Sequence, residues 1–313
     1  MTDIFSEFRN AFRKNHNGLM KLIVINLVVF FILAFFHVVL WLAGNNTIIN
    51  RMLDWVALSP NLLTFITRPW TIITYGFTHD LQDILHILFN MLILYFMGRL
   101  VQDYIGSHRL IAIYILGVIF GALFFFAFYN LIPLLASHKD IARLIGASGG
   151  VYAVIVAAAT IAPETIVMLF GIFPIRLKYI AWAAIFLSFL QLTGPNTGGN
   201  AAHLGGALLG YLFIIQLRKG NDWGKPINQF LDWWQSLFQP KKPKMKLTYV
   251  REKKQTVKTA SQAKQNKPEQ TIASGAVPSQ EELDMILDKI SAKGYDSLTK
   301  EEKQKLFNAS RQD

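Results

Sequence analysis

Cysteine is absent from this chain of 313 residues, and charged residues are scarce. The lack of cysteine excludes disulfide bonds, thiolate zinc sites, iron–sulfur clusters and a cysteine nucleophile. Charged residues make up 16% of the chain, against about 25% in an average soluble domain, whereas hydrophobic residues make up 52% and the mean hydropathy is +0.33. This composition excludes an ordinary water-soluble domain and indicates a membrane protein.

The few charges are unevenly distributed. Residues 1–218 contain 13 Lys/Arg and 8 Asp/Glu, whereas residues 219–313 contain 18 and 12. The first part therefore suits a bilayer and the last part suits water. A formal net charge of +11 could indicate nucleic-acid binding, but basic excess in a membrane protein usually marks the cytoplasmic side and anionic lipid. We expect the lipid bilayer as a partner and no nucleic acid.

Six apolar stretches are candidates for membrane-spanning helices. The first, residues 22–43, is long enough to cross about 30 Å of hydrocarbon, and it exceeds the apolar region of about 7 to 15 residues in a cleaved signal peptide. The others are residues 84–101, 110–129, 147–162, 179–192 and 201–217. The sequence thus predicts an all-α, polytopic membrane protein with six transmembrane helices.

Basic residues flank these stretches asymmetrically. With the N-terminus inside, eight Lys/Arg fall on inner segments before the tail and four fall on outer loops. This bias favours both termini in the cytoplasm. The first outer segment, residues 44–83, has apolar patches too short to span a bilayer. We expect it to lie partly in the interface, with the rings of Trp55, Trp70 and Tyr75 at headgroup depth.

Four polar residues interrupt the spans near their starts. His86 and Asn90 lie one turn apart in the second span, Ser148 opens the fourth and His203 lies early in the sixth. In the predicted orientation all three spans run inward, so these residues share one depth. Polar or ionisable side chains inside a membrane are costly and are functional-site candidates. A serine nucleophile, a histidine base and oxyanion donors must converge in this way.

Small residues recur at every fourth position in the fourth and sixth spans, a spacing that favours close helix packing. They are Gly149, Ala153 and Ala157, and then Ala202, Gly206 and Gly210. Contact between these two faces would bring His203 beside Ser148.

The string Gly146–Gly150 also fits the nucleophile elbow of soluble hydrolases. That elbow needs a preceding strand and an acid between the serine and the histidine. A charged loop precedes Ser148, and the acid before His203 is Glu164, expected at the opposite membrane face. The residues therefore predict a Ser–His dyad rather than a triad.

These motifs resemble those of the rhomboid intramembrane serine proteases. The resemblance covers about residues 20–218 and rests on His86-x-x-x-Asn90, Gly146-x-Ser148-Gly149 and Ala202-His203-x-x-Gly206. It implies a six-helix rhomboid bundle in which Ser148 is the nucleophile and His203 the general base. It also implies that His86, Asn90 and the backbone N–H of Ser148 are the oxyanion donors.

The resemblance gives supporting roles to Tyr152, which would pack on His203, and to Gly146, Gly149 and Gly206. It implies transmembrane protein substrates cut near the outer face, no metal, no cofactor, and the inner membrane of a bacterial cell. Many members carry Trp-Arg in the first loop, whereas here Thr71 follows Trp70. Whether Arg68 replaces that arginine stays open.

Two other functions remain possible at this point. One is a catalytically inactive rhomboid-like scaffold or trafficking factor, and the other is a transporter whose His and Asn bind a proton or a solute. A lone serine in a membrane helix usually bonds its own backbone, but four residues that match in type, spacing and depth favour the protease. The loop residues His79, His108 and His138 are expected at the surface or interface.

The chain is expected to divide into a cytoplasmic segment 1–20, a protease domain 21–218, a basic flexible linker 219–279 and a small helical module 280–310. The basic run Lys241–Lys246 would lie beside the inner leaflet. Apolar positions between 283 and 290 predict one helix of the module, and Thr299 to Glu302 form a capping box for a second.

This soluble, partly disordered tail thus ends in a helical hairpin, with Gly294 as a C-cap. The hairpin resembles a short C-terminal module appended to some bacterial rhomboids. It is too small to be very stable alone, so it is expected to dock on itself, the membrane or an unknown partner.

Overall fold

The computed structural model describes residues 17–169, 172–238, 280–293 and 297–309. The chain divides into two compact units, Met1–Pro243 and Lys244–Asp313, and each is described by itself. Most of the predicted segment 1–20, the run Lys241–Lys246 and Gly294 lie outside the described residues.

Six apolar helices form the first unit, one at each stretch predicted to span the membrane. Four are long and apolar enough to cross a bilayer: α2 (Gly18–Leu42), α6 (Ile84–Ile105), α7 (Ser107–Leu131) and α11 (Thr197–Arg218). The other two, α9 (Ser148–Ile161) and α10 (Leu177–Leu190), have 14 residues each and reach only about 21 Å. The protein is therefore an integral membrane protein with four candidate spans and two shorter apolar helices.

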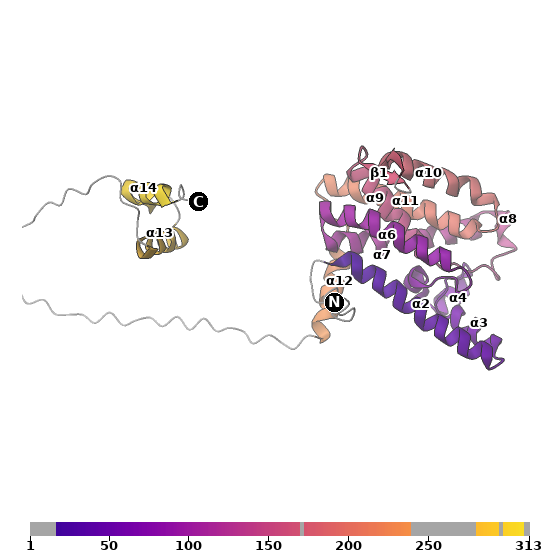
Figure 1. Ribbon diagram of the computed structural model, residues 1–313. Coiled ribbons are helices and arrows are strands. Elements are labelled where there is room, and N and C mark those ends of the chain that lie inside the picture. The colour runs from indigo at the N-terminus through magenta and orange to yellow at the C-terminus, as the bar shows by residue number, and fades with distance from the viewer. Residues whose placement is uncertain (1–16, 170–171, 239–279, 294–296, 310–313) are drawn as a thin grey trace, which may run out of the picture. The chain divides into compact units, whose positions relative to one another are not determined.

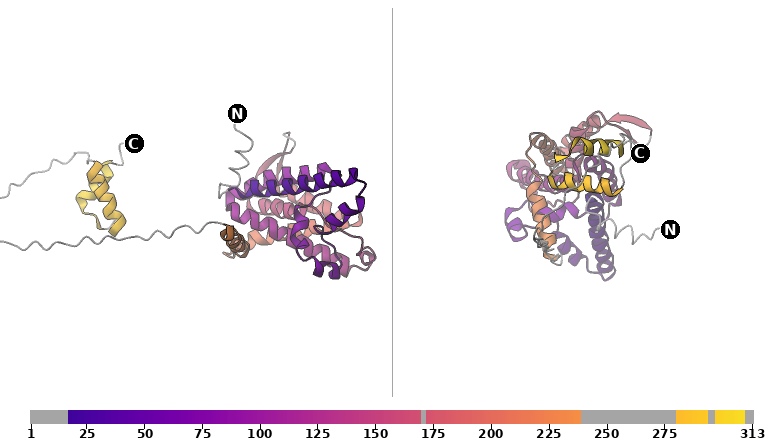
Figure 2. Two further views of the ribbon diagram at one scale, coloured as in Figure 1. Left: turned by 90° about the horizontal axis from the view of Figure 1, so that it is seen from below. Right: turned by 90° about the vertical axis from the view of Figure 1, so that its left-hand side faces the viewer.

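The helices pack around α9. Figure 1 shows α6, α7, α9 and α11 side by side, and α9 contacts α6, α7, α10 and α11. Helix α2 lies along α6 and α7 (Figure 2). Ten of the 14 residues of α9 are buried, so the helix that begins at Ser148 is enclosed by other helices rather than by lipid.

Short elements fill the connections. Between α2 and α6 lie α3 (Asn46–Asp54), α4 (Leu62–Thr67), α5 (Thr71–Thr74) and η1 (Tyr75–Phe77); α8 (Pro133–Ala136) follows α7, and η2 (Gln191–Thr193) follows α10. The long first segment is thus a folded cap of short helices.

A β-hairpin between α9 and α10 departs from the predicted all-α fold. Strand β1 (Ile166–Leu169) pairs antiparallel with β2 (Phe173–Arg176). Ion pairs from Glu164 to Arg176 and Lys178 close its base. Each strand has only four residues and is largely apolar. A run this short shows no distinct strand periodicity, so the sequence does not distinguish it from the end of a neighbouring apolar helix.

Helix α12 (Lys225–Phe238) begins within the range for which the sequence predicts a flexible linker. Phe230, Trp233, Trp234 and Leu237 are all more than half exposed. A salt bridge of 2.8 Å between Arg109 and Asp222 ties the chain just before α12 to the start of α7. The linker prediction missed this helix because its aromatic positions are embedded in a polar, Gln- and Pro-containing stretch.

Glycine contacts set the distance between α9 and α11. A Cβ on Gly206 would overlap the carbonyl of Gly149, and a Cβ on Gly210 would overlap the carbonyl of Ala153. On the other side of α9, a Cβ on Gly117 of α7 would lie 2.5 Å from the Cβ of Ala153. The small-residue faces of α9 and α11, the fourth and sixth predicted spans, are therefore in direct backbone contact.

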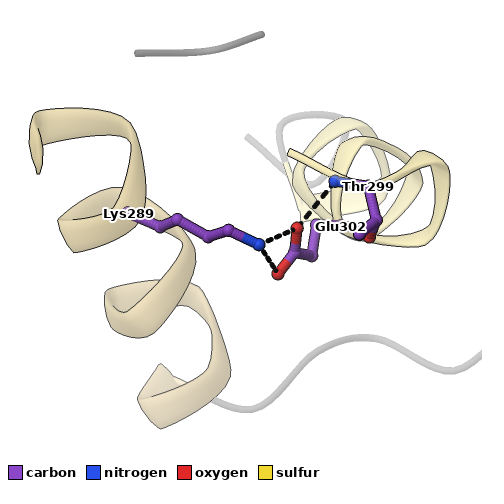
Figure 3. Close-up of polar contacts among 3 residues, drawn as sticks. All are labelled: Lys289, Thr299 and Glu302. Carbon is purple, nitrogen blue, oxygen red and sulfur yellow. Dashed lines mark hydrogen bonds and ion pairs between the residues drawn. The ribbon is translucent and has the colours of Figure 1, made fainter. Parts of the chain in front are cut away.

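Two helices, α13 (Gln280–Lys293) and α14 (Lys300–Ala309), are described in the second unit. Thr299 N–H donates to Glu302 Oε2 at 2.7 Å, and Glu302 N–H donates to Thr299 Oγ1 at 3.3 Å, so the predicted capping box is present. Lys289 reaches from α13 to the same carboxylate at 2.7 Å (Figure 3). The cap of one helix is thereby the salt-bridge partner of the other.

The glycine contact predicts a specific loss of stability. In Gly206→Ala the added methyl group must displace the backbone of α9, which overpacking data place at about 1–3 kcal/mol of unfolding free energy. Thermal unfolding in detergent measures this loss. The matched control is Gly194→Ala, at ordinary φ and with its nearest foreign atom 3.3 Å away. Equal midpoints for the two variants would contradict the packing argument.

Candidate functional site

Ser148 is the first residue of α9 and lies two residues after Gly146, whose backbone conformation sets the path of the chain into the helix. Gly146 has φ of +125°, which L side chains rarely adopt. A Cβ there would lie 3.0 Å from His86 Cε1 and 3.6 Å from Ser148 Oγ. Glycine is therefore required both by the backbone and by the space shared by His86 and Ser148.

The backbone N–H groups at the start of α9 have no partners within the helix, as in any helix N-terminus. The helix dipole adds positive potential at the same place. Ser148 thus sits where a developing negative charge is stabilised.

His203 lies on α11 and contacts Ser148 directly. Its Nε2 is 2.8 Å from Ser148 Oγ. The glycine contact between Gly149 and Gly206 lies one residue after Ser148 on α9 and three residues after His203 on α11. This contact is what permits a hydrogen bond between side chains on two helices.

Two further side chains hold the His203 ring. The Tyr152 ring stacks on it with a centroid distance of 4.1 Å and an interplanar angle of 9°. Ser188 Oγ, from α10, lies 3.1 Å from His203 Nδ1 and donates to Tyr152 OH at 3.0 Å. With the Ser188 hydrogen directed to Tyr152, the Ser188 oxygen can accept from His203 Nδ1–H. In that tautomer Nε2 carries no proton and can accept the one from Ser148.

The sequence reasoning missed Ser188. It is 2% exposed and is a polar residue within an apolar span, the signal that singled out Ser148 and His203. It escaped notice because it lies in no motif.

The two remaining predicted residues lie on α6. The ring of His86 is adjacent to Gly146 and Ser148, as the Gly146 geometry shows. Asn90 is buried, 7% exposed, and its amide donates to the His86 carbonyl at 2.8 Å. The structure therefore brings Ser148, His203 and His86 together. Asn90 lies one turn further along α6, and its side-chain amide donates a hydrogen bond to the backbone of the same helix.

The first loop is tied to the segment before Ser148. Leu58 and Leu144 exchange two backbone hydrogen bonds of 3.0 and 2.8 Å, and Gly146 N–H donates to the Tyr75 carbonyl at 3.0 Å. Tyr75 was expected at headgroup depth, but it is 1% exposed and its hydroxyl donates to the Val118 carbonyl. That expectation was wrong because the loop folds back into the bundle.

Arg68, whose role the sequence leaves open, contacts two other residues of the first loop. Its Nη1 donates to the Asp54 carbonyl at 2.8 Å, and its guanidinium lies 4.9 Å from the Trp55 ring centroid. Trp55 in turn stacks on Trp70 at 5.5 Å. Arg68 and the two indoles thus form one cluster that joins α3 to the chain before α5.

His79 was expected at the surface, but it is fully buried. Neither ring nitrogen has a hydrogen-bond partner, and the ring meets His86 edge-on at a centroid distance of 5.4 Å. Burial, together with the neighbouring His86, lowers the pKa of His79 to about 4. His108 and His138 are exposed as expected.

Within the described ranges, no group of three or more His, Asp or Glu side chains is placed to hold a metal ion.

Four helices long enough to cross a bilayer, together with a hydrogen-bonded serine and histidine on buried helices, define an integral membrane protein with a polar site inside its helical bundle. Residues 67–220 match the Rhomboid domain, and residues 276–312 match a family of unknown function (DUF6576). The first match covers just under half of the chain and places this segment in the rhomboid family.

Two curated relatives are similar to this chain. RHOMBOID-like protein 12, mitochondrial, from Arabidopsis thaliana is 28% identical over 162 residues, which cover 49% of this chain and 48% of the relative. Rhomboid protein 1, mitochondrial, from Saccharomyces cerevisiae is 29% identical over 158 residues, which cover 48% and 42%. The chain thus spans about half the length of the curated relatives it matches.

Burial of His79 predicts that acid destabilises the fold. Between pH 6.5 and 4 the unfolded chain protonates His79 and the folded chain does not, so stability falls as the pH falls. Between pH 7 and pH 5 the loss is on the order of 1–2 kcal/mol. His79→Phe should make this dependence shallower in thermal unfolding by about that amount, whereas the exposed His138→Phe should leave it unchanged. An unchanged slope in His79→Phe would mean that other groups cause the acid sensitivity.

Proposed function

We propose that this protein is an intramembrane serine endopeptidase that cleaves transmembrane segments of other membrane proteins. The observation that carries the proposal is the 2.8 Å contact between Ser148 Oγ and His203 Nε2, with the opposite ring nitrogen held by Ser188. Members of the rhomboid family are typically serine proteases of this kind, and family membership supports the assignment.

The proposed reaction is acyl transfer. Ser148 Oγ attacks the scissile carbonyl carbon while its proton passes to His203 Nε2, and His203 then gives that proton to the leaving amine. The Ser148 N–H, His86 and Asn90 would donate to the oxyanion. Water, activated by His203, then cleaves the acyl-enzyme and regenerates Ser148.

Ser188 is proposed to replace the acid of a triad as the group that orients the base. A hydroxyl cannot neutralise the imidazolium, but by accepting from Nδ1–H it fixes the tautomer and the ring orientation. The stacked Tyr152 ring restricts the ring further. This arrangement needs no buried carboxylate, which would be costly at this depth.

The substrate is proposed to enter sideways and to be cut near the outer face. A transmembrane helix must unwind before a carbonyl can reach Ser148, so segments with glycine or proline should be cut more readily. The short length of α9 supports this depth, because a helix of about 21 Å can begin below the surface of a core of about 30 Å.

The proposed topology has all six apolar helices crossing the membrane and both termini in the cytoplasm. The excess of Lys and Arg on the inner segments supports this orientation. The proposed location is the inner membrane of a bacterial cell. The two similar relatives are mitochondrial proteins by name.

An inactive scaffold is the competing function, and cleavage separates the two. Reconstituted with a transmembrane substrate, the wild-type protein should produce two fragments, and Ser148→Ala should produce none while keeping its thermal midpoint. Ser137→Ala, in an exposed loop, is the matched control and should cleave normally. Absence of cleavage by the wild-type protein on a panel of substrates, or cleavage by Ser148→Ala, would reject the proposal.

The role of Ser188 makes a separate prediction. Ser188→Ala should lower kcat about tenfold, the order of one lost hydrogen bond, and should leave KM unchanged because Ser188 does not contact the substrate. Ser188→Thr, which keeps the hydroxyl, should recover most of the rate. A purely structural role would instead give equal losses in both variants, together with a lower thermal midpoint.

A further inference from the structure

A cavity of about 670 Å³ lies between α9, α10 and α11, and its lining residues on α9 begin at Val156, eight residues after Ser148. It is lined along three helices by mostly apolar side chains, among them Ala159, Ala181, Trp182, Ile185, Ala207 and Tyr211. Its volume falls in the range of small-molecule sites, about 300–1,000 Å³. Trp182 is 68% exposed, so the cavity is a groove that opens toward the surroundings of the bundle.

Cations gather at one end of this groove, where α9 ends, α10 begins and α11 ends. Lys178 lines the groove itself. Arg218 Nη2 donates to the carbonyl of Thr160, another lining residue, at 2.7 Å. Arg176 and Lys178 share one carboxylate, that of Glu164. Three cations thus meet one acid, and the excess positive charge lies beside an apolar groove.

We propose that this groove binds an anionic phospholipid. Its phosphate group would lie at Lys178 and Arg218, and one acyl chain would lie along the apolar lining toward Ile185. An apolar groove in a bilayer accepts any acyl chain, but a polar end with surplus positive charge distinguishes an anionic headgroup from a zwitterionic one. The proposal concerns binding alone and does not depend on the chemistry at Ser148.

The groove also has a structural link to the site. Ile185 lies three residues before Ser188 on α10, and Ala207 lies four residues after His203 on α11. The groove and the serine–histidine site are therefore formed in part by the same two helices. An acyl chain bound in the groove would pack between α10 and its neighbours α9 and α11 and would support the position of α10.

Photocrosslinking from inside the groove tests the proposal. The full-length protein carries benzoylphenylalanine in place of Trp182 and is reconstituted in equal amounts of phosphatidylglycerol and phosphatidylcholine. Mass spectrometry of the adduct should show phosphatidylglycerol enriched about fivefold, the order expected for one cation near an anionic phosphate. Lys178→Gln and Arg218→Gln should each reduce this enrichment.

Arg99→Gln is the matched control. Arg99 lies near the end of α6 and pairs with Asp103 at 3.9 Å, and it does not line the groove. It should leave the enrichment unchanged. Three results would overturn the proposal: the two lipids captured in proportion to the bilayer, a captured protein segment in place of lipid, or enrichment that survives both groove variants.

Discussion

Helices α9 and α11 approach so closely at Gly149 and Gly206 that no side chain fits between them, and the remaining features of the site follow from this contact. The approach lets the His203 side chain reach Ser148 from another helix. A second close approach, between Gly117 and Ala153, packs α9 against α7. In a bilayer the hydrophobic effect does little to join helices, so such packing of small residues is the force that positions the polar pair.

Polar groups within this bundle are satisfied by short chains of neutral partners. One chain runs from Ser148 through His203 and Ser188 to Tyr152. A second runs from Asn26 through the Tyr114 hydroxyl to the Gly76 carbonyl, with a hydrogen bond of 2.7 Å at its end. Neutral partners avoid the cost of a buried charge while still fixing each donor and acceptor. His79 lacks such a partner at both ring nitrogens, and its burial is the basis of the predicted acid sensitivity.

The sequence predicts the positions of the six apolar helices because each is a continuous apolar run, and it predicts the meeting of α9 and α11 from the spacing of small residues. It does not show how the first loop folds. Tyr75 and His79 have the sequence features of interfacial residues. The inward turn of the loop is shown by the hydrogen bonds between Leu58 and Leu144 and by the bond from Gly146 N–H to the Tyr75 carbonyl. Likewise Ser188 lies 15 residues before His203 on another helix, and no local periodicity relates them. The hairpin of β1 and β2 is too short for its own pattern to be recognised.

The central claim is that Ser148 is activated by His203, and covalent labelling tests it most directly. The purified protein is treated with a fluorophosphonate, and the modified residue is located by peptide mapping and mass spectrometry. We predict a single adduct on Ser148 in the wild-type protein and little or none in His203→Ala. An adduct on another serine, no adduct at all, or undiminished labelling of Ser148 in His203→Ala would contradict the account.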